Sequence, residues 1–283
     1  MKRFIKSIIY LLMFLIVFLV TQLFVGVVIG LLGFNAYSDE LFMLNYLLSM
    51  GLAFVAVTIF ERVAFKSITP IEAKWSGFDP VAVLAGVVLL IALSVVLAPL
   101  STILPADDRV FHNGPCTLIT IVVLAPIFEE LIFRGRLYNT LQRNASPLLS
   151  TSLSALAFGV VHLNPIVMIE ALLVGVIFSY FYLLKRSIIT PILLHMCNNA
   201  IAYALLVLSY QGVPLRQIIG SLNLTIVLYV VSAIIFIASA VIIVRYFVKQ
   251  GREGGDKVVD DQTPAVEPCE ETPEQVNTPH EEA

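Results

Sequence analysis

Charged side chains are scarce in this 283-residue chain. Asp, Glu, Lys and Arg together make up 13% of it, whereas a typical soluble domain has about 25%. Hydrophobic residues make up 59%, and the mean hydropathy is +0.93. A chain with so little charge cannot cover its surface with polar groups in water, which excludes a soluble globular protein. The composition therefore predicts an integral membrane protein whose solvent is the lipid bilayer.

Several catalytic motifs are also missing. The sequence has no HExxH, no GxSxG and no GxxxxGK, which argues against a zincin, a nucleophile-elbow serine hydrolase and a P-loop protein. No aspartate lies in a long apolar segment, which argues against an intramembrane aspartyl dyad. The three cysteines, Cys116, Cys197 and Cys269, form no CxxC pair and do not suit a disulfide framework.

Long apolar runs dominate what is present. A membrane-spanning helix needs about 20 apolar residues, and the chain has eight candidate segments, of which the fifth is the shortest. The sequence therefore predicts an all-α polytopic membrane helical bundle of about eight transmembrane helices within residues 1–250. The segments are 5–33, 42–63, 80–104, 116–136, 149–162, 165–184, 188–209 and 222–246.

Basic residues divide unevenly between the connections of these segments. With the N-terminus inside, 15 of the 17 Lys and Arg residues fall on the cytoplasmic side, and only Arg109 and Arg216 fall outside. Cytoplasmic loops carry an excess of Lys and Arg. We therefore expect both termini in the cytoplasm and, as the location, a bacterial cell membrane.

The C-terminal residues 251–283 differ from the rest. They contain 10 acidic and 2 basic residues, are rich in Pro, Glu, Gly and Thr, and have no aromatic residue. Such a composition cannot bury enough apolar surface to fold, so we expect a disordered acidic cytoplasmic tail. The net charge of −3 comes from this tail. It does not indicate a nucleic-acid partner, and we expect none.

Ionisable side chains within the apolar segments are few. Such groups are costly in a bilayer and usually mark a function. Glu170, in the sixth segment, stands alone, and we expect a structural role for it. The others fall into three groups on the fourth, fifth and seventh segments: Glu129, Glu130 and Arg134; His162; and His195 with Asn198 and Asn199.

The spacing of these residues is helical. Glu130 and Arg134 are four residues apart, so they share a helix face and can pair. Glu129 points about 100° away and is left without that cation. Pro126 lacks a backbone N–H, so it is expected to kink the helix and to open space beside the carboxylates.

An unpaired carboxylate and two histidines from other helices suit hydrolysis. A carboxylate beside an imidazole can take a proton from water, while a second imidazole and a carboxamide can stabilise an oxyanion. The same groups could instead hold a metal, because two His and one Glu suffice as ligands for catalytic zinc. The residues alone leave both alternatives open.

Three motifs on successive segments resemble one family. They are EExxxR at Glu129–Arg134, FxxxH at Phe158–His162 and HxxxN at His195–Asn199. All three in this order, within residues 115–205, are similar to the CPBP family of intramembrane proteases, the CAAX-protease and bacteriocin-processing family, also called Abi.

The resemblance implies a helical membrane fold with a cavity open to the cytoplasm, and peptide-bond hydrolysis. It implies that Glu129 is the general base, that His162 helps to activate water, and that His195 and Asn199 stabilise the oxyanion. Glu130, Arg134 and Phe158 would support these groups. The family is commonly labelled a metalloprotease, so Zn²⁺ held by Glu129, His162 and His195 stays an alternative to a metal-independent glutamate protease.

Two classes of function remain. The first is an intramembrane endopeptidase that acts on a peptide or a membrane-associated protein. The second is a non-enzymatic immunity or scaffold protein that binds a partner peptide. The complete motif set favours the enzyme, because a scaffold does not need an intact base, two histidines and an asparagine. A proton-coupled transporter is a weaker third reading, because the two halves show no matching broken helices.

The charge distribution predicts a cytoplasmic C-terminal end. A reporter that is active only outside the cytoplasm should be inactive when it is fused after residue 250, and active when it is inserted near residue 109. Activity after residue 250 would show that the number of spans is different.

Overall fold

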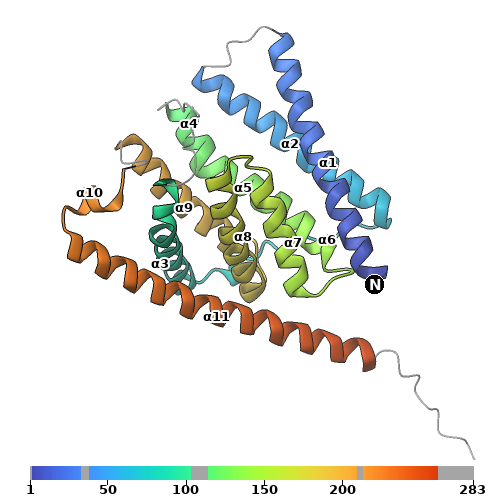
Figure 1. Cartoon of the computed structure of the whole chain (residues 1–283). Coiled ribbons are helices and arrows are strands. Elements are labelled where there is room, and N and C mark those ends of the chain that lie inside the picture. The colour runs from blue at the N-terminus through green and yellow to red at the C-terminus, as the bar shows by residue number, and fades with distance from the viewer. Residues whose placement is uncertain (1, 33–37, 103–113, 209–212, 261–283) are drawn as a thin grey trace, which may run out of the picture.

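The computed structural model describes residues 2–32, 38–102, 114–208 and 213–260, and within them every regular element is helical (Figure 1). Seven helical stretches of these residues are long and apolar enough to cross a membrane. The predicted all-α polytopic bundle is therefore confirmed. The seven stretches are Phe4–Leu31, Asp39–Phe65, Pro80–Leu100, Pro115–Leu141, Pro165–Lys185, Ile189–Val207 and Leu222–Gln250.

These stretches correspond to most of the helices in Figure 1. The first three lie on α1 (Lys2–Leu31), on α2 (Asp39–Phe65), and on α3 (Pro80–Leu97) with the start of the 3₁₀ turn η2 (Ala98–Thr102). The last three lie on α8 (Pro165–Lys185), α9 (Ile189–Val207) and α11 (Leu222–Asp260). Two short elements lie in the connections, η1 (Trp75–Gly77) and α10 (Leu215–Ile219).

The fifth predicted segment forms a helix that is too short to cross a bilayer alone. This helix, α7 (Pro147–Val160), has 14 residues and so measures about 21 Å, against a hydrocarbon core of about 30 Å. It ends before His162 because the chain turns there, with Leu163 at a φ of 60°. Most of its side chains face the interior of the bundle, and Ala157 and Phe158 are buried. The orientation that was inferred from eight spans stays a prediction.

Three helices begin with a capping residue followed directly by proline. In each, the capping side chain accepts hydrogen bonds from backbone N–H groups of the first turn. Proline suits the first helical position because a backbone N–H there would have no partner within the helix, so its absence costs no hydrogen bond. The pairs are Asp79-Pro80, Ser146-Pro147 and Asn164-Pro165.

The fourth span changes its helical register twice. It consists of α4 (Pro115–Ile119), the π-helical segment η3 (Thr120–Leu124), α5 (Ala125–Glu130), the π-helical segment η4 (Leu131–Tyr138) and α6 (Asn139–Leu141). Short π-helical stretches within α-helices are frequent at functional sites. Both glutamates of the EExxxR motif stand between the two π-helical segments.

Two hydrophobic clusters hold the bundle together. The first joins α1, α2, the fourth span and α7, with aromatic contacts that run from Phe14 to Phe133 (5.9 Å) and from Phe133 to Phe158 (5.2 Å). The second joins α3, α8, α9 and α11, and includes the fully buried Phe178 and Leu194. The candidate site lies where the two clusters meet.

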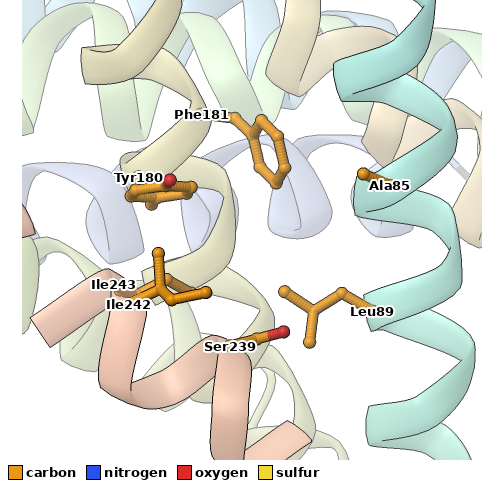
Figure 2. A pocket seen from close by; sticks show the side chains of 7 residues that line it. All are labelled: Ala85, Leu89, Tyr180, Phe181, Ser239, Ile242 and Ile243. Atoms are coloured by element: carbon orange, nitrogen blue, oxygen red, sulfur yellow. The ribbon is translucent and has the colours of Figure 1, made fainter. Parts of the chain in front are cut away.

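A cavity of about 140 Å³ lies between α3, α8 and α11 (Figure 2). Its lining is apolar except for the hydroxyl groups of Tyr180 and Ser239. The lining contains no carboxylate and no imidazole.

The last helix is longer than predicted. α11 extends to Asp260, ten residues beyond the predicted start of the tail. An established helix propagates easily, since each added residue gains a hydrogen bond without a new nucleation step. Residues 261–283 and Arg109 lie outside the described residues, so the disorder of the remaining tail stays a prediction.

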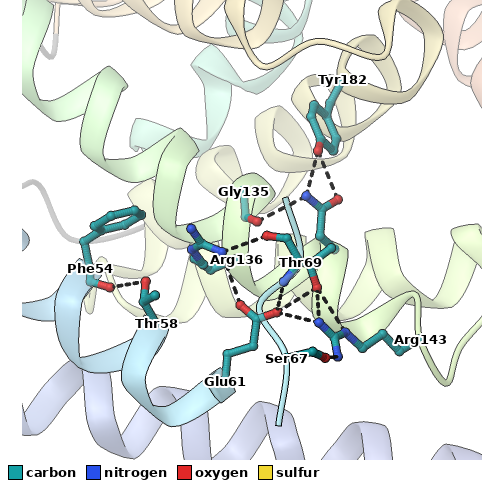
Figure 3. Close-up of polar contacts among 10 residues, drawn as sticks. Phe54, Thr58, Glu61, Ser67, Thr69, Gly135, Arg136, Arg143 and Tyr182 are labelled. Atoms are coloured by element: carbon teal, nitrogen blue, oxygen red, sulfur yellow. Dashed lines mark hydrogen bonds and ion pairs between the residues drawn. The ribbon is translucent and has the colours of Figure 1, made fainter. Parts of the chain in front are cut away.

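A buried ion-pair network ties α2 to the end of the fourth span (Figure 3). Glu61, on α2, has no exposed surface. Its carboxylate lies 3.4 Å from Arg136 Nη1 and 2.9 Å from Arg143 Nη2. It also accepts hydrogen bonds from the backbone N–H and the hydroxyl of Thr69, both at 2.7 Å. The connector after α2 is therefore fixed against the bundle.

Replacing Glu61 should destabilise the fold, because Glu61→Ala leaves two arginines facing each other without a counter-charge. Breaking a buried ion pair on one side costs about 3–5 kcal/mol. Glu72→Ala is the matched control, since Glu72 pairs with Lys74 at 2.7 Å on the surface, where such pairs contribute about 0–1 kcal/mol. The measurement is equilibrium unfolding in mixed micelles. Equal losses in both variants would contradict the structural role of Glu61.

Candidate active site

The centre of the site is a fully buried ion pair. Arg134 Nη1 lies 2.8 Å from Glu130 Oε1, and neither side chain is exposed. The predicted pairing of these two residues is confirmed. Arg134 also donates from Nη2 to the carbonyl oxygen of Gly175 on α8, at 3.0 Å. Its guanidinium carbon lies 4.7 Å from the ring centre of Phe158 and 5.4 Å from that of Phe178. The cation is thereby held between the two hydrophobic clusters.

His195 lies between the two glutamates. Its Nδ1 is 3.1 Å from Glu130 Oε1, and its Nε2 is 3.7 Å from Glu129 Oε2. The imidazole also packs against Phe178 at 4.8 Å and Phe158 at 5.8 Å. Because an ionised Glu130 can only accept hydrogen bonds, Nδ1 must carry a proton. Nε2 then faces Glu129, and the ring orientation is fixed from both sides.

Glu129 differs from Glu130 in its surroundings. Its side chain is 15% exposed, whereas that of Glu130 has no exposed surface. Among the ion pairs of the described residues, Arg134 is joined to Glu130 and not to Glu129. Glu129 has a hydrogen-bond partner that the sequence spacing did not reveal. The hydroxyl group of Tyr46, on α2, donates a hydrogen bond to Glu129 Oε1 at 2.9 Å. Oε2 is the oxygen that faces His195.

His162 stands in the turn that follows α7. Its Nδ1 lies 2.7 Å from the carbonyl oxygen of Phe158, so Nδ1 carries the proton and Nε2 is the free basic nitrogen. Its ring packs edge-on against Phe158 at 5.1 Å. Phe158 therefore contacts both histidines and the arginine of the site. Within the described residues, His162 has no direct hydrogen bond to either glutamate.

Asn199 contacts the π-helical segment η3 rather than a glutamate. Its side-chain nitrogen donates to the carbonyl oxygen of Ile121 at 2.9 Å. The neighbouring Thr120 carbonyl accepts from the N–H of Ala125, five residues ahead. In the same register Ile121 would need the N–H of residue 126, which is a proline and has none. Asn199 therefore satisfies the carbonyl that Pro126 leaves without a donor.

The described residues do not fit the metal alternative as they are arranged. Among the ranges that the structure describes, no three His, Cys, Asp or Glu side chains are grouped so that they could hold a metal ion. Glu129 and His195 lie together, but the contacts of His162 are with Phe158.

Two comparisons with known proteins found similarities to membrane peptidases. A family model described as "Type II CAAX prenyl endopeptidase Rce1-like" matches residues 112–201. A Bacillus subtilis (strain 168) protein named "Putative membrane peptidase YdiL" is 26% identical over 121 residues, which cover 41% of this chain and 50% of that protein. The match thus spans half of that relative's length. No solved structure matches the chain significantly. These matches support the CPBP, or CAAX-protease, family, as the three motifs indicate.

The contact between Asn199 and Ile121 predicts a specific dependence on Pro126. Asn199→Ala should lower the free energy of unfolding by about 1–2 kcal/mol, because a partly buried carbonyl loses its donor. Pro126→Ala supplies a new backbone N–H near that carbonyl. In the Pro126→Ala background, the loss caused by Asn199→Ala should therefore fall by at least about half.

The measurement is a double-mutant cycle of equilibrium unfolding with the four proteins. Equal losses in both backgrounds would show that Asn199 does not compensate for the proline. A loss of peptide cleavage that persists in the double variant would indicate a separate role of Asn199 in the reaction.

Proposed function

We propose that this chain, whose residues 112–201 match the Rce1-like type II CAAX prenyl endopeptidases, is an intramembrane endopeptidase. The observation that supports this best is the arrangement of His195 between two carboxylates of unlike exposure. One carboxylate, Glu130, is sealed and paired with a cation, and the other, Glu129, can meet water. Acid–base hydrolysis needs this combination of a fixed orienting group and an accessible base.

In the proposed reaction Glu129 is the general base. Oε2 accepts a proton from a water molecule, and the water oxygen attacks the carbonyl carbon of the scissile peptide bond. The carbonyl π bond opens, and the negative charge moves to its oxygen. When the tetrahedral intermediate collapses, Glu129 passes its proton to the nitrogen of the leaving amine. The water and one peptide bond are consumed, and the carboxylate is regenerated.

Other residues would stabilise this intermediate. His195 is oriented through Nδ1 by Glu130, and when the ring is doubly protonated its Nε2–H can donate a hydrogen bond to the oxyanion. Asn199 uses one amide hydrogen on Ile121, and its second amide hydrogen can serve the same oxyanion. His162, with Nε2 free, helps to orient the water. Phe158 keeps both imidazoles in place.

The proposed substrate is a peptide or a membrane-associated protein in the bilayer. The matching family model is described as a prenyl endopeptidase, but the described residues show no feature that selects a prenyl group. The relative from Bacillus subtilis and the uneven distribution of basic residues support a bacterial cell membrane with cytoplasmic termini. The seven apolar helices place the protein in a membrane.

Replacing the proposed base tests the function directly. Glu129→Gln keeps the size of the side chain but cannot accept the proton, so cleavage should fall by a factor on the order of 10²–10⁴. Glu170→Gln is the matched control, since it makes the same change on α8 and should retain activity. The substrate probe is a pool of synthetic peptides, each with and without a lipidated cysteine near its C-terminus. Mass spectrometry detects the products.

Equal cleavage by wild type and Glu129→Gln would contradict the proposed role of Glu129. An intact fold with no cleavage by the wild type would instead favour a scaffold or immunity protein. The same assay addresses the metal. We expect activity to persist after treatment with a chelator, and inhibition that added zinc reverses would show that a metal takes part.

A further inference from the structure

We propose that Tyr46 is a positioning residue of the peptidase site, an inference that rests on the proposed function. Its hydroxyl donates to Glu129 Oε1 at 2.9 Å. Tyr46 lies on α2, far outside residues 112–201 that match the family model. A helix without any of the three motifs thus contributes a direct contact to the proposed base.

The contact settles which oxygen of Glu129 is free. The terminal torsion of a glutamate is broad, so an unpartnered carboxylate would turn between many orientations. The Tyr46 hydroxyl holds Oε1, which leaves Oε2 directed toward His195 at 3.7 Å. The proton acceptor and the imidazole then keep a fixed relation before substrate arrives, and such preorganisation of catalytic groups raises the rate.

The helix α2, which carries Tyr46, is attached to the fourth span at one point before Tyr46 and at another point after it. At its start, the Asp39 carboxylate accepts hydrogen bonds from the N–H groups of Cys116 and Thr117, at 2.8 and 2.7 Å, and so caps α4. Near its end, Glu61 forms the ion-pair network with Arg136 and Arg143. Because both attachments reach the span that carries Glu129, α2 cannot slide along that span without breaking one of them.

Tyr46 is also partly buried and packs against the first hydrophobic cluster. Its ring is thereby held while its hydroxyl reaches the polar site. Tyr46 therefore differs from a tyrosine whose hydroxyl bonds only to structural groups outside the site. Tyr182 makes the useful comparison, because its hydroxyl exchanges hydrogen bonds with Asn139 at 2.8 and 3.0 Å, in contact with neither glutamate.

The test compares Tyr46→Phe with Tyr182→Phe in the peptide assay, in detergent and with the full chain. Both variants lose one hydroxyl and keep the ring. Tyr46→Phe should lower kcat by about 10- to 100-fold, the size of loss that misplaced catalytic groups cause, with KM changed less than about twofold. Tyr182→Phe should leave kcat within about twofold of wild type. Tyr182→Phe should lower the melting temperature at least as much as Tyr46→Phe, since its hydroxyl exchanges two hydrogen bonds with Asn139 and that of Tyr46 makes one.

A kcat for Tyr46→Phe that equals that of Tyr182→Phe would overturn the inference. So would a loss of kcat that merely parallels the loss of folded protein. If Tyr46→Phe does not fold, Asp39→Asn provides the second test. It weakens the attachment of α2 and should lower kcat with little change in KM, whereas its neighbour Glu40→Gln should not. Unchanged kcat in Asp39→Asn would then overturn the inference.

The two proposals fail in different ways. If wild type cleaves no peptide, or if Glu129→Gln cleaves as well as wild type, the proposed function fails. If wild type is active, Glu129→Gln is inactive and Tyr46→Phe keeps its kcat, only the role of Tyr46 fails.

Discussion

The ion pair between Glu130 and Arg134 is the constraint around which the site is built. Two charges that are taken out of water lose much hydration, and their mutual attraction compensates only when the remaining donors and acceptors are also satisfied. Here the second guanidinium nitrogen bonds to Gly175, two aromatic rings lie beside the cation, and His195 bonds to the carboxylate oxygen that also meets Arg134. The compensation is incomplete, because Glu130 Oε2 and Arg134 Nε are buried without a hydrogen-bond partner among the described residues. The partners of the pair come from α7, α8 and α9, so the pair also links the positions of these three helices.

Two adjacent glutamates acquire opposite properties from this arrangement. Neighbouring residues on a helix point about 100° apart, so Glu130 faces the buried arginine while Glu129 faces His195 and Tyr46. The π-helical segments on either side adjust the helix around this short stretch. Pro126 has no backbone N–H to donate to the carbonyl oxygen of Ile121 in the first of these segments. The side chain of Asn199 supplies a donor to that oxygen instead. A residue that the motif suggests for catalysis thus has a clear structural contact as well.

Spacing along the sequence predicts side-chain contacts within one helix, whereas contacts between different helices depend on how the helices pack. The pairing of Glu130 with Arg134 followed from their separation of four residues, and the apolar runs predicted the spans. The length of α7 was not predictable from hydropathy, because its end is set by the turn at Leu163. The contact of His195 with Glu130 joins residues 65 positions apart, and that of Tyr46 with Glu129 joins residues 83 positions apart. No periodicity encodes such contacts. The burial of Glu61 was not predicted, because this residue stands near the end of the apolar segment 42–63.

The position of Tyr46 explains why a motif can identify a site without containing all that the site needs. The residues matched by the family model include the proposed acid–base groups Glu129, His162 and His195. The group that orients Glu129 can come from any neighbouring helix that brings a donor to the right place. Here α2 supplies it, and the same helix is held by Asp39 at one end and Glu61 at the other. The geometry of the proposed base therefore depends on charges near both ends of α2 as well as on the motif itself.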